Sequence, residues 1–151
     1  MKSVMISIQP QWCELIATGR KKMELRKNRP NLPLPFKCYI YQTKRKRLCK
    51  WANALGLYDL AEKLDNSHGK VIGEFTCFAI LGHCEMANAD LAERASVVRR
   101  EEIRKYANGK EVFGWGICDF VMYKYPKKLK CFGIERPPQS WCYVEEDQGN
   151  E

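Results

Sequence analysis

The sequence predicts an α+β fold, a small mixed β-barrel of five or six short strands with helices inserted between the strands. Short runs of alternating apolar and polar residues predict the strands, because successive side chains of a strand point to opposite sides. Runs of apolar residues at helical spacing lie between them. The 151 residues show no internal repeat, low-complexity stretch or shift in composition. We therefore expect a single domain over residues 1–151.

The N-terminal part of the chain predicts a strand, a helix and a second strand in close succession. Residues 4–8 are apolar and β-prone. Pro10 then suits the first position of a helix, and Gly19 suits its left-handed end. Residues 21–26 alternate apolar and charged side chains, as expected of a half-buried strand.

Further strands are predicted along the rest of the chain. Prolines in residues 30–35 exclude both a helix and a central strand there. The later segments with strand character are residues 38–43, 70–81, 115–123 and 129–134. After these, Pro137 and Pro138 predict an irregular tail.

Two helical regions are predicted between these strands. The first falls in a basic segment at about 44–68, where the helical spacing is broken near Gly56. The second spans residues 91–106, in one or two pieces, and Asp90 with Glu93 three residues later resembles a capping box at its start.

Charge is distributed unevenly along the chain. The first fifty residues contain thirteen basic residues and two acids, so they carry a net charge of +11, whereas the remainder carries −3. A positive region beside a mildly acidic remainder is typical of proteins that bind a polyanion. Basic residues that only keep the surface soluble are the alternative explanation.

The sequence also limits the compartment and the cofactors. No apolar run approaches the length of a membrane span, and residues 1–6 do not look like a signal peptide. The eight cysteines form no Cys-x-x-Cys pair, so we expect reduced, buried side chains and no disulfides in a cytoplasmic protein. Cys77, His83 and Cys84 lack a second pair at zinc spacing. We expect no metal and no cofactor.

The segment with the most chemical character is Gly19-x-Lys21-x-x-Glu24-x-Arg26. Glycine permits a sharp turn and leaves room for a ligand near the backbone. Glu24 and Arg26 lie two residues apart, on one side of the predicted strand, and Lys21 reaches the same cleft from the turn. Such a group suits a ligand with donor and acceptor edges, such as a base or a phosphate. An exposed charged strand without a ligand is the alternative.

Two other segments are candidate binding sites. Lys44, Arg45, Lys46 and Arg47 can neutralise phosphates, and the nearby Trp51 either stacks on a base or packs in the core. Gln139, Ser140 and Trp141 follow two prolines, and they either fold over the cleft to read a base edge or close the end of the barrel.

The order of these features resembles the ASCH domain family, the PUA-like β-barrel domains related to activating signal cointegrator. The residues that carry the resemblance are Ile6-Ser7-Ile8-x-Pro10, the Gly19-to-Arg26 segment, Tyr39-Ile40-Tyr41-x-Thr43-Lys44, Gly69-to-Phe75, Gly114-Trp115-x-Ile117 and Arg136-to-Tyr143. The resemblance covers nearly the whole chain, and the insertion at about 44–68 is its least typical part. It implies a PUA-like barrel with the Gly19-to-Arg26 segment at the mouth of a cleft.

The resemblance also implies a function, namely binding of RNA or a nucleotide. A small hydrolase acting on a modified nucleoside or on RNA, amidohydrolase-like or ribonuclease-like, is the first alternative, with Lys21 and Glu24 as catalytic residues. In the amidohydrolase branch a threonine stands where this chain has Glu24, which argues against that reaction here. Glu24 would act as a general base only if burial raised its pKa. A protein-interaction accessory domain is the second alternative.

Overall fold

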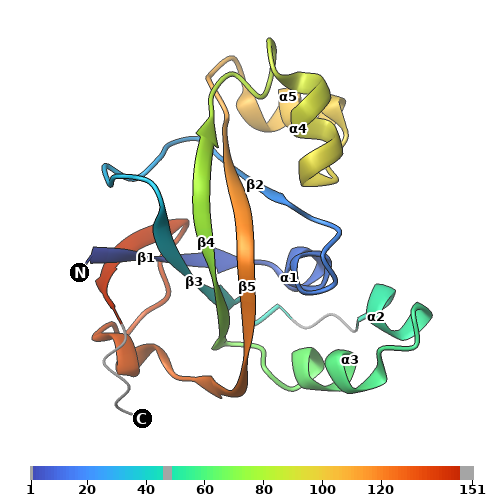
Figure 1. The fold of residues 1–151 in the computed structure, drawn as a ribbon, viewed down its shortest axis with the longest axis vertical. Helices are drawn as coiled ribbons and strands as arrows, with labels where there is room; N and C mark the ends of the chain where they lie inside the picture. Colours follow the sequence, from blue (N-terminus) through green and yellow to red (C-terminus); the bar gives the residue numbers. More distant parts are fainter. Residues whose placement is uncertain (1, 46–48, 147–151) are drawn as a thin grey trace.

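The computed structural model describes residues 2–45 and 49–146. Its centre is one six-stranded sheet with the strand order β2-β5-β4-β3-β1-β6 (Figure 1). The strands are β1 (Lys2–Ile8), β2 (Met23–Arg26), β3 (Phe36–Gln42), β4 (Lys70–Leu81), β5 (Phe113–Lys127) and β6 (Trp141–Glu145). The long β4 and β5 form an antiparallel ladder from one end of the molecule to the other.

The sheet is mixed, because β1 and β3 pair in parallel while every other neighbouring pair is antiparallel. A parallel pair needs a long crossover, which here contains the first helix and β2. The strand order leaves β2 and β6 as edges, so the curled sheet is a half-barrel. The predicted α+β class, with five or six strands and helices inserted between them, is confirmed, and the sheet is a half-barrel.

The helices gather at the two ends of the β4–β5 ladder. Figure 1 shows α4 and α5 at one end and α2 and α3 near the other, with α1 between them. They are α1 (Pro10–Ala17), α2 (Trp51–Ala54), α3 (Tyr58–Asp65), α4 (Ala89–Ser96) and α5 (Arg100–Ala107), followed by the 3₁₀ helix η1 (Leu129–Phe132). None of the helices in the described residues is long and apolar enough to cross a membrane.

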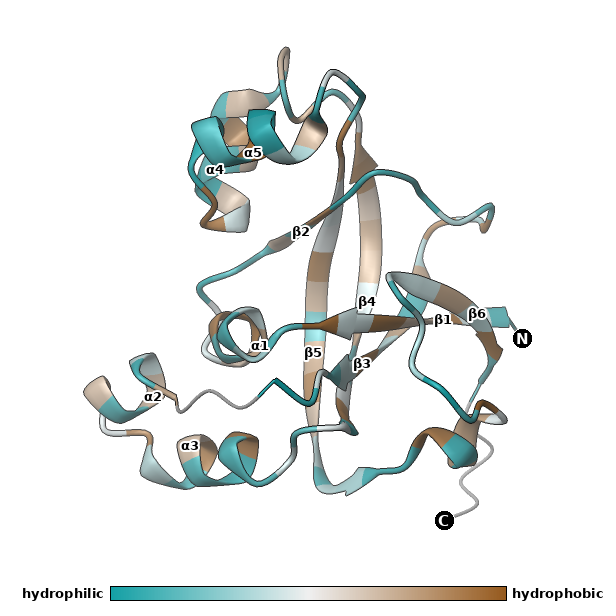
Figure 2. Cartoon of the chain, turned by 180° about the vertical axis from the view of Figure 1, so that it is seen from behind, coloured by the Kyte–Doolittle hydropathy of each residue, from teal (hydrophilic) through white to brown (hydrophobic). Residues whose placement is uncertain are grey.

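The largest hydrophobic cluster lies between the sheet and α1, α2 and α3. Ile6, Ile40, Phe75 and Trp115 are buried within it. Figure 2 shows the hydrophobic residues concentrated on β1 and the inner strands, whereas the connection that follows β2 is largely hydrophilic. All eight cysteines are free, and five of them are buried.

The last strand differs from the prediction. Residues 129–134 contain a 3₁₀ helix, and the sixth strand is β6, which lies within the segment predicted as an irregular tail. The apolar side chains of residues 129–134 pack against the sheet, where the ring of Phe132 lies 4.6 Å from that of Tyr39. β6 forms because the edge of β1 needs a partner, which five antiparallel residue pairs provide.

The predicted capping box is also wrong. Helix α4 begins at Ala89 after Asn88, and no side chain caps it. The carboxylate of Glu93 instead accepts a hydrogen bond of 2.7 Å from the backbone N–H of Arg100, at the start of α5. The two-piece helix is confirmed, since Val97 adopts a left-handed conformation (φ 62°) and separates α4 from α5.

Candidate functional site

A cleft of about 1020 Å³ opens beside the Gly19-to-Arg26 segment. Its floor comes from Lys21 and β2, and α1 contributes Trp12. The linker between α4 and α5 lies across from these, and Ser140 closes the side next to β1. The cleft therefore lies where the two edges of the half-barrel and two helical regions meet.

The turn after α1 directs Lys21 into the cleft. Gly19 has a φ of 79°, and the backbone N–H groups of Arg20 and Lys21 both donate to the carbonyl oxygen of Leu15, over 2.9 and 3.0 Å. A β-carbon at Gly19 would meet nothing within 4 Å, and Gly19 does not line the cleft. Gly19 thus provides the turn and leaves no particular space for a ligand.

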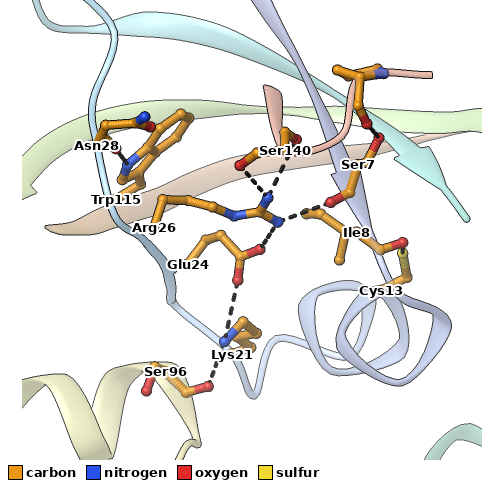
Figure 3. Close-up of polar contacts among 11 residues, drawn as sticks. Ser7, Ile8, Cys13, Lys21, Glu24, Arg26, Asn28, Ser96, Trp115 and Ser140 are labelled. Carbon is orange, nitrogen blue, oxygen red and sulfur yellow. Dashed lines mark hydrogen bonds and ion pairs between the residues drawn. The ribbon is translucent and has the colours of Figure 1, made fainter. Parts of the chain in front are cut away.

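Lys21 is only 2% exposed, yet it carries an ammonium group. Its Nζ donates to the carbonyl oxygen of Ser96 over 2.7 Å and lies 3.5 Å from Oε1 of Glu24 (Figure 3). The same Nζ stands 4.7 Å from the centre of the Trp12 ring. Burial lowers the pKa of Lys21, and the attraction of Glu24 offsets that effect only in part.

Glu24 lies between the two cations. Its Oε2 accepts a hydrogen bond of 2.6 Å from Nη2 of Arg26, and its Oε1 faces Lys21. Burial by itself raises the pKa of Glu24, but Arg26 and Lys21 together outweigh burial and hold the pKa below its usual value. Glu24 is therefore an ionised carboxylate at neutral pH, and the condition for its acting as a general base is not met.

Arg26 connects three segments of the chain. Besides Glu24, its Nη2 donates to the carbonyl oxygen of Ser7 on β1 over 2.9 Å. Its Nη1 donates to both the carbonyl oxygen and the hydroxyl of Ser140, over 3.3 and 3.0 Å. Figure 3 shows the guanidinium group at the centre of these contacts. The guanidinium group thereby links the two edges of the half-barrel across the cleft.

The three residues predicted from the tail have different positions. Gln139 and Ser140 line the cleft, whereas Trp141 does not. The indole N–H of Trp141 donates to Oδ1 of Asn28 over 2.7 Å, and its ring packs edge-on against Trp115. Trp141 therefore lies outside the cleft lining and packs against the core residue Trp115.

The basic run lies next to the cleft and outside it. Thr43 lines the cleft, and the next residues, Lys44 and Arg45, are exposed. Lys46 and Arg47 lie outside the described residues. Trp51 is 44% exposed, and the guanidinium group of Arg20 lies 4.4 Å from its ring centre, so Trp51 is not a core residue.

One wall of the cleft was not predicted at all. The α4–α5 linker contributes Val97, Val98 and Arg99, and α5 contributes Tyr106, whose ring lies 4.8 Å from Nζ of Lys27. Four basic and two acidic side chains line the cleft in total. The break between the two helices was the only signal in the sequence, and it does not indicate that the linker packs beside Lys21.

Among the residues that the structure describes, no group of three His, Cys, Asp or Glu side chains could hold a metal ion. The six-stranded half-barrel with its flanking helices is a fold that solved ASCH structures share.

Solved structures of ASCH from Zymomonas mobilis share the fold over nearly the whole chain. One mutant superimposes with a TM-score of 0.72 at 18% identity and covers 97% of this chain and 93% of the other. Another mutant gives 0.71 at 18% identity, with 96% and 89% covered. The structure titled simply ASCH gives 0.71 at 19% identity, with 95% and 88% covered. No family model and no curated protein sequence matches the chain.

Proposed function

We propose that this protein binds RNA or a nucleotide, with one nucleotide held in the cleft above Lys21, Glu24 and Arg26. The observation that carries the proposal is the buried charge cluster on the cleft floor. Its three charged groups are fixed by one another and by Ser7, Ser96 and Ser140. Charged groups held in this way keep their orientation when a polar ligand arrives.

Stability alone does not account for this cluster. Moving three charges out of water costs several kcal/mol for each ion, and well-packed apolar side chains of the same volume are often as stabilising. Trp12, Leu25 and Ile103 line the same cleft, so an apolar floor would be compatible with its walls. Recognition of a polar ligand would explain why charged residues stand on the cleft floor instead of apolar ones.

The rim of the cleft offers the groups that a nucleotide requires. Lys27 and Arg99 are exposed cations that can approach a phosphate. Gln139 is exposed beside them and presents an amide that can pair with a base edge. Trp12 supplies an aromatic surface next to the floor. These side chains recognise charge, hydrogen-bonding edges and aromatic rings, which nucleotides combine.

A hydrolase that acts on a modified nucleoside or on RNA is the second candidate. The lowered pKa of a buried lysine in a cleft favours it, because such lysines serve as bases and nucleophiles. The contacts favour binding instead, since the ammonium group of Lys21 and the carboxylate of Glu24 are each occupied by two or more partners.

The test is titration of the protein with mononucleotides and short RNA at low salt, monitored by tryptophan fluorescence. Trp12 lines the cleft, whereas Trp51, Trp115 and Trp141 do not. Substitution Trp12→Phe should therefore remove most of the change in fluorescence. Neutralising Lys27 and Arg99 with glutamine should weaken binding, and Glu102→Gln, which removes an acid from the same rim, should strengthen it. Absence of binding by any of these ligands at low salt would refute the proposal.

Turnover is measured separately with acylated nucleosides and labelled RNA. Product formed by the wild type and abolished in Lys21→Met would establish the hydrolase. Binding without product would leave the binding function alone.

A further inference from the structure

The fold brings three basic segments together at the end of the sheet that is far from α4 and α5. β4 begins with Lys70, which pairs with Gln42 at the end of β3. β5 ends with Lys127, which pairs with Val71 of β4. Lys44 and Arg45 follow β3, and Lys128 follows β5. We call these five residues (Lys44, Arg45, Lys70, Lys127 and Lys128) the basic sheet end.

Direct contacts support this juxtaposition. The side chain of Lys44 lies across Gly69, where an added β-carbon would stand 3.0 Å from Cγ of the lysine. The backbone N–H of Gly69 donates to the carbonyl oxygen of Gln42 over 2.7 Å. Figure 1 shows the beginning of β4 beside the end of β5. The lysines are therefore close in space although they are up to 84 positions apart in the sequence.

The segments that form this surface carry no acidic residue, and beside them Glu74 of β4 accepts a hydrogen bond of 2.9 Å from the hydroxyl of Tyr123. Residues 42–45, 66–71 and 123–130 contain no aspartate or glutamate. Nζ of Lys127 lies 4.8 Å from the centre of the Tyr123 ring, which fixes its position over β5. Tyr125, 70% exposed, and Nζ of Lys124, 5.5 Å from its ring, extend the surface. Basic side chains interleaved with an exposed aromatic ring are typical of surfaces that bind single-stranded nucleic acid.

The basic sheet end begins next to the cleft. Thr43 lines the cleft, and the following residue is Lys44. Lys44 follows β3, and Lys70 and Lys127 lie on the next two strands, so the backbone at these three residues spans about 10 Å, which is two strand spacings. Lys127 pairs with Val71, so its side chain and that of Lys70 point to opposite sides of the sheet end. A free nucleotide in the cleft would not reach it.

We infer that the basic sheet end binds the phosphate backbone of a single-stranded RNA, one nucleotide of which occupies the cleft. The inference rests on the proposed function, and it specifies the ligand as a polymer. The strand is single because a nucleotide inside the cleft cannot remain paired with a complementary base. The cleft selects the nucleotide, and the basic sheet end supplies affinity that does not depend on sequence.

The test compares a mononucleotide with single-stranded RNA homopolymers of increasing length, each measured over a range of salt concentrations. Lys70→Gln with Lys128→Gln is the variant, since both lysines are exposed. Lys105→Gln with Lys110→Gln is the matched control, because these exposed lysines lie before β5, at the opposite end of the ladder. The variant should reduce the slope of log affinity against log salt for long RNA by about 1.4, or roughly 0.7 for each phosphate that is no longer neutralised. The control should leave the slope unchanged, and neither should alter mononucleotide binding.

Three results would overturn the inference. The first is an affinity that stays the same from the mononucleotide to the longest RNA, which leaves the proposed function intact. The second is an equal effect of both double variants on the slope. The third is binding to vesicles of anionic lipid with none to RNA, which would make the surface a membrane contact. Failure of every nucleotide and every RNA to bind refutes the proposed function as well.

Discussion

Arg26 on one edge strand and Ser140, directly before the other edge strand, are joined by two hydrogen bonds from Nη1 of the arginine. The sheet is open by its strand order, and these bonds link its two edges. The same arginine donates to Ser7 on β1 and pairs with Glu24 on its own strand. The cleft is therefore held in shape by a single guanidinium group that contacts three segments.

Substitution Arg26→Lys should lower the free energy of unfolding by about 2 kcal/mol. Lysine retains the charge beside Glu24, but an ammonium group lacks the planar fork needed to reach Ser7 and Ser140 together. Urea denaturation checks this value. Ser140→Ala is the control, because it removes only the hydroxyl acceptor and should cost about 1 kcal/mol. Equal stability of Arg26→Lys and the wild type would show that the link does not hold the edges.

Glu24→Gln should destabilise the protein more than Lys21→Met does. Glu24→Gln leaves two buried cations without a counter-charge, at a cost of about 3–5 kcal/mol. Lys21→Met leaves the Glu24–Arg26 pair neutral and frees only the carbonyl of Ser96, at about 1–3 kcal/mol. Chemical denaturation of both variants under the same conditions measures the difference. The reverse order would contradict the assignment of Glu24 as the shared counter-ion.

Acid should remove the contribution of Glu24 to stability. Its pKa in the folded protein lies below the usual 4.5, because the two cations outweigh burial. The native state therefore binds fewer protons than the unfolded chain in acid, so the contribution is fully present above about pH 4.5 and is lost as the pH falls through the folded pKa. The difference in unfolding free energy between the wild type and Glu24→Gln should accordingly shrink below that pH. A difference that stays constant would show that the pKa of Glu24 is not lowered.

Two glycines should respond differently to replacement by alanine. Gly19 has a φ of 79° and open space around its missing β-carbon, so Gly19→Ala should cost about 1–2 kcal/mol from backbone conformation alone. An alanine β-carbon at Gly73 would clash with the backbone oxygen of Val121, so β4 and β5 would have to separate there. Thermal unfolding should show a modest shift for Gly19→Ala and a much larger one for Gly73→Ala. Similar shifts would mean that the ladder accommodates a side chain.

The sequence predicts β4 fully, because residues 70–81 are mostly apolar or β-branched and lie between a turn and a loop. It does not predict β6. Trp141–Glu145 has ordinary strand character, and only its pairing with β1, more than 130 residues earlier, decides its conformation. Residues 129–134 have strand character in the sequence, but they contain a 3₁₀ helix that buries Phe132. Local pattern thus describes the central strands and β2 well, and it describes the edge strand β6 poorly.

The candidate site shows the same limit. The spacing of Lys21, Glu24 and Arg26 indicates a common cleft, but it does not reveal that these charges satisfy one another. It also cannot reveal Ser96 as the partner of Lys21, or Arg99 and Tyr106 as part of the cleft wall. These contacts depend on the left-handed turn at Val97, which places the α4–α5 linker beside the floor. A valine gives no sequence signal for that conformation.

The position of Ser140 has a consequence for biosynthesis. A ribosome makes Ser7, Glu24 and Arg26 early, whereas the acceptors at Ser140 arrive more than 110 residues after Arg26, once β5 and the 3₁₀ helix have been made. A nascent chain that ends before residue 140 thus has Arg26 without its cross-cleft partner and β1 without β6. The cleft is therefore among the last features to be completed, and a partly synthesised chain lacks the side that Ser140 closes.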